Sequence, residues 1–342
     1  MLLKNFFKTR ELSIVGAVVL IAIFFVLLAP HFGSITNIQD IGSETAMLAI
    51  LAAAETPVIL TRNVDISVAA IVGMTAFITA QLLSDGFIKN SLESLLMALI
   101  VGAILGLING TVVVVGRVPA IIATLGTDSI FRGLLIVISR GQQIYPSQIP
   151  PAIPDIFSIT VLGIPSFVLI AVAVLIPGAF LMRYIPALRE LYAVGSNPAG
   201  AQSVGIPVGR RILLAFILCG LLSGLVGFLF VSRFASVASN AASGMELTAI
   251  AAAVVGGVSL FGGSGSLVGA MLGALILSIL PNGLALMNVS EFIQLILQGA
   301  LIVGATAVHT ALSGRLSRTK VTQLAPSIAA GKAGKKVEVR NE

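Results

Sequence analysis

Long apolar runs without charged residues dominate this sequence. Charged side chains are absent from residues 12–29, 66–84, 94–116, 156–182, 212–232 and 247–290. A helix of about 20 apolar residues crosses the hydrocarbon core of a bilayer, and most of these runs reach or approach that length. Each backbone amide in hydrocarbon needs a partner within the chain, so the runs predict transmembrane helices.

Proline, glycine and charged positions between the apolar runs divide the chain into about ten expected spans. We place them near residues 12–30, 42–61, 66–84, 92–115, 119–139, 161–182, 211–232, 245–260, 266–281 and 291–312. The expected fold class is all-α, a polytopic transmembrane domain over residues 1–313. Residues 314–342 are basic and lack apolar periodicity, so we expect them to form a disordered cytoplasmic tail.

Composition and charge agree with a membrane protein. Hydrophobic residues make up 57% of the 342 residues and charged residues only 10%, which leaves too little polar surface for a water-soluble fold. The net charge of +6 is concentrated in the two tails, so it marks cytoplasmic ends and excludes a nucleic-acid surface. With an even number of spans, both termini are expected in the cytoplasm, with Arg62, Arg117 and residues 183–211 on the same side of a bacterial inner membrane.

Glycines recur every fourth residue in three of the expected spans. This spacing lets the backbones of two helices approach closely and predicts tight helix packing with no chemical role of its own. The repeats are Gly102, Gly106 and Gly110, then Gly220 and Gly224, then Gly265, Gly269 and Gly273.

The segment from about 184 to 210 carries the signals of a short cytoplasmic helix. Asn197 can cap free amides, Pro198 suits the first helical position, and Gly205 suits a left-handed helix end. The helix would present a face of small residues, Ala199, Gly200 and Ala201. From these residues alone, an ordinary structured loop is an equal alternative.

Four blocks of the chain, in order, resemble the sugar-importing ABC permeases of the ribose, xylose, arabinose and autoinducer-2 group. Residues 60–68 resemble the Gly-Ile-Asp-Leu-Ser-Val-Gly motif of these permeases, and residues 119–126 and 246–263 resemble two further motifs. The fourth block is the coupling-helix pattern, matched by Ala193, Gly195, Asn197, Gly205 and Ile206. Arg62 and Asn63 replace the small residues usual in ribose-type members, a form closer to autoinducer-2 and rhamnose-type permeases.

This resemblance implies the permease subunit of an ATP-driven importer for a small sugar or sugar-like molecule such as ribose, rhamnose or autoinducer-2. It implies ABC ATPase subunits, a second permease copy or a sibling permease, and a periplasmic substrate-binding protein as partners. ATP would bind to the partner subunit, because the sequence has no phosphate-binding loop. We expect no catalytic residue, no metal and no cofactor in this chain. Contact with the ATPase is assigned to Ala193, Gly195, Asn197, Pro198, Ala199, Gly200, Ala201, Gly205 and Ile206.

Polar residues within apolar spans are candidates for the translocation path, because ionisable groups in a bilayer are costly unless they are paired or face water. Asp128 and Arg132 are four residues apart and share a helix face with Thr124. A structural ion pair at this position is an open alternative. The full set of candidates is Glu55, Asn63, Asp65, Asn109, Thr124, Asp128, Arg132 and Glu246.

Other functions fit the sequence less well. A branched-chain amino-acid ABC permease is disfavoured by the Asn-Val-Asp-Ile-Ser-Val block at residues 63–68. An ion-coupled secondary transporter would need no partner. An intramembrane serine protease would need Ser264 and His309, but Ser264 falls in a glycine-rich turn.

Overall fold

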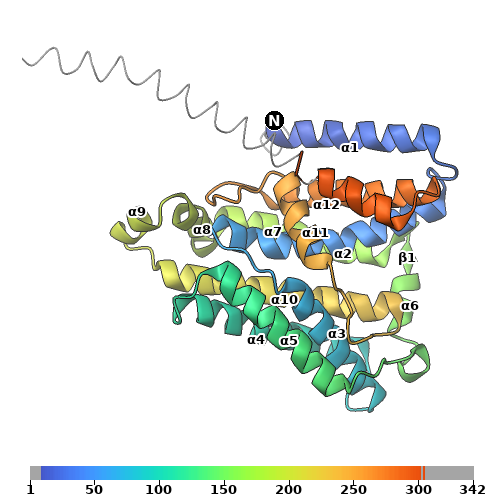
Figure 1. Ribbon diagram of the computed structural model, residues 1–342, viewed down its shortest axis with the longest axis horizontal. Coiled ribbons are helices and arrows are strands. Elements are labelled where there is room, and N and C mark those ends of the chain that lie inside the picture. The colour runs from blue at the N-terminus through green and yellow to red at the C-terminus, as the bar shows by residue number, and fades with distance from the viewer. Residues whose placement is uncertain (1–8, 302, 305–342) are drawn as a thin grey trace, which may run out of the picture. The chain divides into compact units, whose positions relative to one another are not determined.

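The computed structural model describes residues 9–301 and 303–304 (Figure 1). The chain divides into two compact units, residues 1–295 and residues 296–342. The expected tail 314–342, the last part of the tenth expected span and His309 lie outside the described residues.

The first unit is built from helices, with one small hairpin. The long helices are α1 (Thr9–Leu28), α2 (Ile35–Leu60), α3 (Val68–Ser84), α4 (Ser91–Val114), α5 (Ala120–Ser139), α7 (Ser166–Tyr184), α10 (Val208–Phe234) and α12 (Leu267–Leu286). The shorter elements are η2 (Pro146–Gln148), α6 (Pro154–Ser158), β1 (Thr160–Val161), β2 (Ile164–Pro165), α8 (Pro186–Ser196), α9 (Pro198–Ser203) and α11 (Met245–Val255). This architecture confirms the all-α polytopic fold class.

The expected spans correspond to helices, with two differences. Among the described residues, seven helices are long and apolar enough to cross a membrane, and Val68–Ser84, Met245–Val255 and Glu291–Leu301 are shorter apolar helices. Helix α11 ends before the expected limit of residue 260, because Gly257 adopts a left-handed φ of 91° and turns the chain. Helix α7 begins at Ser166 instead of residue 161, because β1 and β2 form a hairpin there.

Helices α4 and α10 pack backbone against backbone. A Cβ atom added to Gly106 would lie 2.3 Å from the carbonyl oxygen of Phe216, and one added to Gly220 would lie 2.2 Å from the carbonyl oxygen of Gly102. The glycine spacing in the sequence predicted this close approach, and the structure confirms it.

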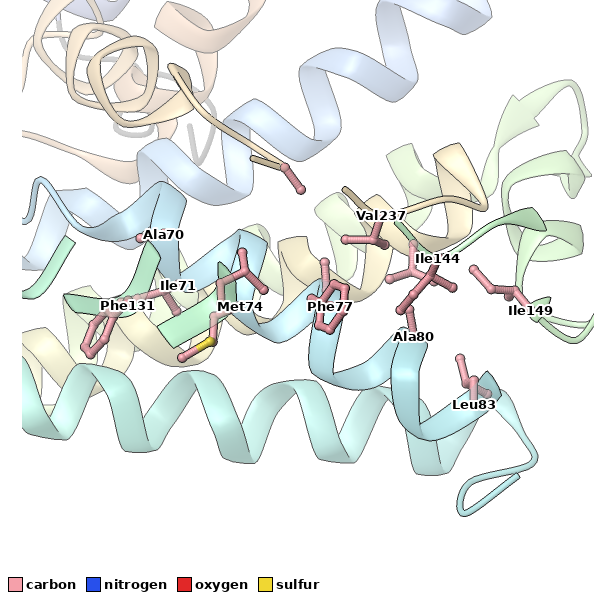
Figure 2. Packing of buried hydrophobic residues seen from close by; sticks show 14 of the residues in the cluster. Ala70, Ile71, Met74, Phe77, Ala80, Leu83, Phe131, Ile144, Ile149 and Val237 are labelled. Carbon is pink, nitrogen blue, oxygen red and sulfur yellow. The ribbon is translucent and has the colours of Figure 1, made fainter. Parts of the chain in front are cut away.

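Helices α2 and α3 form the interior of the bundle. The second half of α2 and most of α3 are buried, while α4 and α5 expose apolar side chains on their outer faces. Figure 2 shows Ile71, Met74 and Phe77 of α3 packed together with Phe131 of α5 in one hydrophobic cluster. The loop of residues 61–67 joins these two helices, and Thr61, Asp65 and Ser67 within it are buried while Arg62 is exposed.

Candidate functional site

The segment after α7 folds as a capped short helix. The Oδ1 atom of Asn197 accepts a hydrogen bond from the Gly200 amide at 3.0 Å, and Pro198 is the first residue of α9. Gly205 follows the helix with a φ of 86°, and the Ile206 amide donates to the carbonyl oxygen of Ala201 at 3.0 Å. The structure confirms the helix and both of its predicted ends, and so decides against an irregular loop.

The small residues of α9 do not all face outward. Ala199 is exposed, but Ala201 is only 5% exposed and packs against its own chain. The expected docking face of Ala199, Gly200 and Ala201 therefore needs correction, because a helix of six residues turns its third and fourth positions toward different sides. The exposed residues of α9 and of the turn after it are Ala199, Gln202, Ser203, Val204 and Gly205.

Gly195 and Ala193 have structural positions at the end of α8. A Cβ atom at Gly195 would lie 1.7 Å from the carbonyl oxygen of Leu60, so only glycine permits α8 to approach the end of α2. The carbonyl oxygen of Ala193 accepts the Asn197 amide at 3.0 Å, the last bond of α8.

A fully buried polar cluster lies where the loop 61–67 meets α4. The carboxylate of Asp65 accepts hydrogen bonds from the Ser67 amide at 3.0 Å and from the Ser67 hydroxyl at 2.7 Å. The Asn109 amide on α4 donates to the same carboxylate at 3.1 Å and to the Ser67 hydroxyl oxygen at 2.6 Å. These contacts fasten the loop to α4 from within the bundle.

Two further predicted residues join this buried polar cluster. The Thr124 hydroxyl on α5 accepts the Ile66 amide at 3.1 Å, and the Glu55 carboxylate on α2 accepts the Asp65 amide at 3.5 Å. Glu55, Asp65, Asn109 and Thr124 each show 0% exposure. The cluster therefore ties α2, α4 and α5 around the loop and does not face an open channel in this conformation.

A second set of predicted residues forms a partly open ion cluster on α5 and α11. Arg132 Nε lies 3.1 Å from Asp128 Oδ1, and Arg132 Nη2 lies 3.5 Å from Glu246 Oε2. Arg132 Nη1 donates to the Ser243 hydroxyl at 2.8 Å. About a fifth of each charged side chain is exposed, and α5 carries no charged residue besides Asp128 and Arg132. Charged groups within a span usually face water or another protein segment, so this cluster is the better candidate for lining a path.

Asn63 belongs to neither cluster. Its side-chain amide donates to the Thr61 carbonyl at 3.0 Å and to the Thr61 hydroxyl at 2.9 Å. Asn63 lines a groove of about 350 Å³ formed with the end of α4 and the start of α10. A neighbouring groove of about 530 Å³ includes Gln202 and Ile206 of the coupling segment, residues 184–210. Asn63 thus faces a groove that adjoins the coupling segment.

Sequence reasoning missed two residues of these sites. Ser67 bonds both Asp65 and Asn109, and its position two residues after Asp65 in a loop is a known setting for such a bond. Arg62 donates hydrogen bonds to the carbonyl oxygens of Gly195 and Ser196 at the end of α8. Among the described residues, no group of three or more His, Cys, Asp or Glu side chains is placed to hold a metal ion.

Comparison with known proteins shows the family of the chain. Residues 37–306 match the family model described as branched-chain amino acid transport system / permease component. The chain is 37% identical to the ribose import permease protein RbsC of Escherichia coli (strain K12) over 303 residues, 87% of this chain and 93% of that protein. It is 34% identical to the autoinducer 2 import system permease protein LsrC of Enterobacter sp. (strain 638) over 318 residues, 92% of this chain and 91% of that protein. No solved structure matches.

Proposed function

This chain belongs to the family of permease components of branched-chain amino acid transport systems, and on that premise we propose that it imports a small sugar or sugar-like molecule. It is the membrane-spanning subunit of an ATP-driven importer and a multi-pass protein of the bacterial inner membrane. The observation that carries the substrate class is the similarity to import permeases whose names specify ribose and autoinducer 2, over most of each chain.

In this proposal the chain forms the translocation path and the surface to which the ATPase subunits bind. The ATPase subunits bind and hydrolyse ATP. The exposed helix α9 lies at one end of the first unit, and the hairpin β1–β2 lies at the other end (Figure 1). An ATPase bound at α9 would act from the cytoplasm. A periplasmic substrate-binding protein would then meet the opposite end, where the chain between α5 and α7 forms η2, α6 and the hairpin.

A second permease, either another copy or a sibling, completes the path. The ion cluster of Asp128, Arg132 and Glu246 supports this part of the proposal, because the exposed fifth of each charged side chain would otherwise face lipid, where charge is costly. A sugar carries many hydroxyl groups, and a carboxylate and a guanidinium together offer both acceptors and donors to them.

Transport by the complete complex tests the proposal. The permease is co-expressed with its candidate ATPase and substrate-binding protein and reconstituted in proteoliposomes. The proteoliposomes are supplied with labelled ribose, rhamnose, autoinducer-2 or leucine. We expect ATP-dependent uptake of one of the sugar-like ligands, and no hydrolysis of ATP by the permease alone. Uptake of leucine in place of every sugar-like ligand would contradict the substrate class, and uptake driven by an ion gradient without ATPase would contradict the mechanism.

A further inference from the structure

Three segments far apart in the sequence meet at the end of α2. The carbonyl oxygen of Leu60, the last residue of α2, accepts the Gly263 amide at 2.9 Å. The same oxygen lies against Gly195 at the end of α8, where a Cβ atom would clash. Figure 1 shows α8 beside α2 at this end of the unit, with the loop between α11 and α12 extending toward it. We call this meeting point, Leu60 to Arg62 with Gly195, Ser196 and Gly263, the α2 junction.

Arg62 connects the α2 junction to the coupling segment. Its Nη2 atom donates to the carbonyl oxygen of Ser196 at 2.7 Å, and its Nε atom donates to the carbonyl oxygen of Gly195. These are the last carbonyl groups of α8, which have no amide partner within the helix. A guanidinium suits this position because it offers several donors in a fixed geometry and its charge complements the helix C-terminus.

The backbone of Arg62 adopts the left-handed region, with a φ of 66°. A residue other than glycine is uncommon in this conformation. Here the conformation directs the long side chain back across the end of α2 toward α8. Helix α9 begins at Pro198, two residues beyond Ser196. Arg62 therefore holds the corner from which α9 projects.

In the other direction, Arg62 is three residues from Asp65. Asp65 is fixed to Asn109 of α4 and to Ser67 at the start of α3. The short segment from Arg62 to Asp65 thus connects the corner of α9 to the buried polar cluster, because hydrogen bonds hold it at both ends. Along the sequence, α9 is joined directly only to α8 and α10, so Arg62 adds a separate connection to α2, α3 and α4.

We propose that Arg62 is a positioning residue that fastens the corner of α9 to the end of α2, so that displacement of α9 by a bound ATPase moves the loop carrying Asp65. This inference rests on the proposed function, because it needs an ATPase at α9. Arg62 is exposed, so its removal would let water bond the freed carbonyl groups and leave the fold intact. The expected defect is one of coupling between ATP hydrolysis and transport, with assembly preserved.

The experiment uses the complete complex in proteoliposomes, with uptake and ATP hydrolysis measured on the same samples. Variants are Arg62→Gln, Arg62→Lys and the matched control Arg117→Gln. Arg117 is also exposed and left-handed, with a φ of 54°, and in the described part of the chain it makes no hydrogen bond or ion pair. Co-purification of the ATPase with the tagged permease is measured for each variant.

We expect Arg62→Gln to keep ATPase co-purification and hydrolysis within about twofold of wild type, while molecules imported per ATP fall about five- to tenfold, the scale of a typical coupling energy between sites. Arg62→Lys should recover part of this ratio because an ammonium group can still donate to one carbonyl. Arg117→Gln should match wild type. Three results would overturn the inference. They are an unchanged number of molecules imported per ATP in Arg62→Gln, failure of the ATPase to co-purify with Arg62→Gln, and an equal loss of coupling in Arg117→Gln. Failure of the proposed function would appear separately, as absent ATP-dependent uptake in the wild-type complex.

Discussion

The guanidinium of Arg132 on α5 lies 3.5 Å from the carboxylate of Glu246 on α11, and 3.1 Å from that of Asp128 on its own helix. Asp128 and Arg132 lie near the middle of a span of 20 residues. Arg132 thus balances two carboxylates at a depth where charge is costly, and it joins two helices that are distant in the sequence.

Replacing Arg132 by Gln should reduce both stability and transport. The change leaves Asp128 and Glu246 without their cation. Asp128 lies near the centre of its span, where a charged residue costs about 2.5–3.5 kcal/mol on insertion scales. We expect a lower midpoint of thermal unfolding in detergent and uptake at least about tenfold lower, from a barrier increase of about 1.4 kcal/mol or more.

A triple variant separates the two effects of the Arg132 change. Asp128→Asn, Arg132→Gln and Glu246→Gln together remove all three charges and should restore the unfolding midpoint toward wild type. If the ion cluster contacts the sugar, uptake should remain low despite the restored stability. Wild-type uptake by the triple variant would instead assign the cluster to a structural tie.

The glycine contact between α4 and α10 predicts a sharp difference between two conservative changes. Gly106→Ala places a methyl group 2.3 Å from the carbonyl oxygen of Phe216, which forces the helices apart. Overpacking of this kind costs about 1–3 kcal/mol. Gly126→Ala on α5 is the control, because an added Cβ atom there meets nothing within 4 Å. Thermal unfolding, monitored by size-exclusion chromatography of heated samples, should show a lower midpoint temperature for Gly106→Ala and a wild-type midpoint for Gly126→Ala. Equal midpoints for the two variants would contradict the backbone contact between α4 and α10.

Charge on the exposed side of α9 should block attachment of the ATPase. Ala199→Glu adds a carboxylate at an exposed position, where a desolvated and unpaired charge in an interface costs several kcal/mol (about 2–5). Ala199→Ser, a small neutral change at the same position, is the control. We expect pull-down of the tagged permease to recover the ATPase with Ala199→Ser and little of it with Ala199→Glu. Full recovery and full uptake with Ala199→Glu would exclude α9 as the coupling element.

The orientation in the membrane can be tested with the single cysteine background. Cys219 is buried, so added cysteines can be labelled selectively. Leu162 at the tip of the hairpin is 97% exposed and Val204 after α9 is 76% exposed. In intact cells, a maleimide that cannot cross the inner membrane should label Leu162→Cys but not Val204→Cys, which should react only after permeabilisation. The reverse pattern would place α9 outside and contradict the cytoplasmic coupling segment.

Local sequence signals predicted the helices and the ends of α9 well. The spacing of apolar residues and glycines depends only on near neighbours, and Asn197, Pro198 and Gly205 act through bonds within a few residues. The hairpin before α7 was missed because residues 160–165 are as apolar as a span. Its turn uses Leu162 with a φ of 54°, a conformation that leucine does not signal.

Relations between distant residues were harder to predict. In the sequence, the eight candidates for the translocation path formed a single set. The structure divides seven of them between the buried polar cluster and the ion cluster, and Asn63 belongs to neither. Ala201 looked equivalent to Ala199 until tertiary packing buried it. Arg62 gave no sign of its partners, because the carbonyl groups of Gly195 and Ser196 are available only after α8 ends beside α2.

The backbone contact between α4 and α10 also links the protein to the thickness of its membrane. Helix α10 has 27 residues and α4 has 24, lengths of about 40 Å and 36 Å at 1.5 Å per residue. Both exceed a hydrocarbon core of about 30 Å, so each must tilt or extend into the headgroup region. Because glycine contacts join them, the two helices must adapt as one body. A change in lipid acyl-chain length should therefore shift Asn109 on α4 and the start of α10 together, so that bilayer thickness would act on the buried polar cluster and on the end of the coupling segment at once.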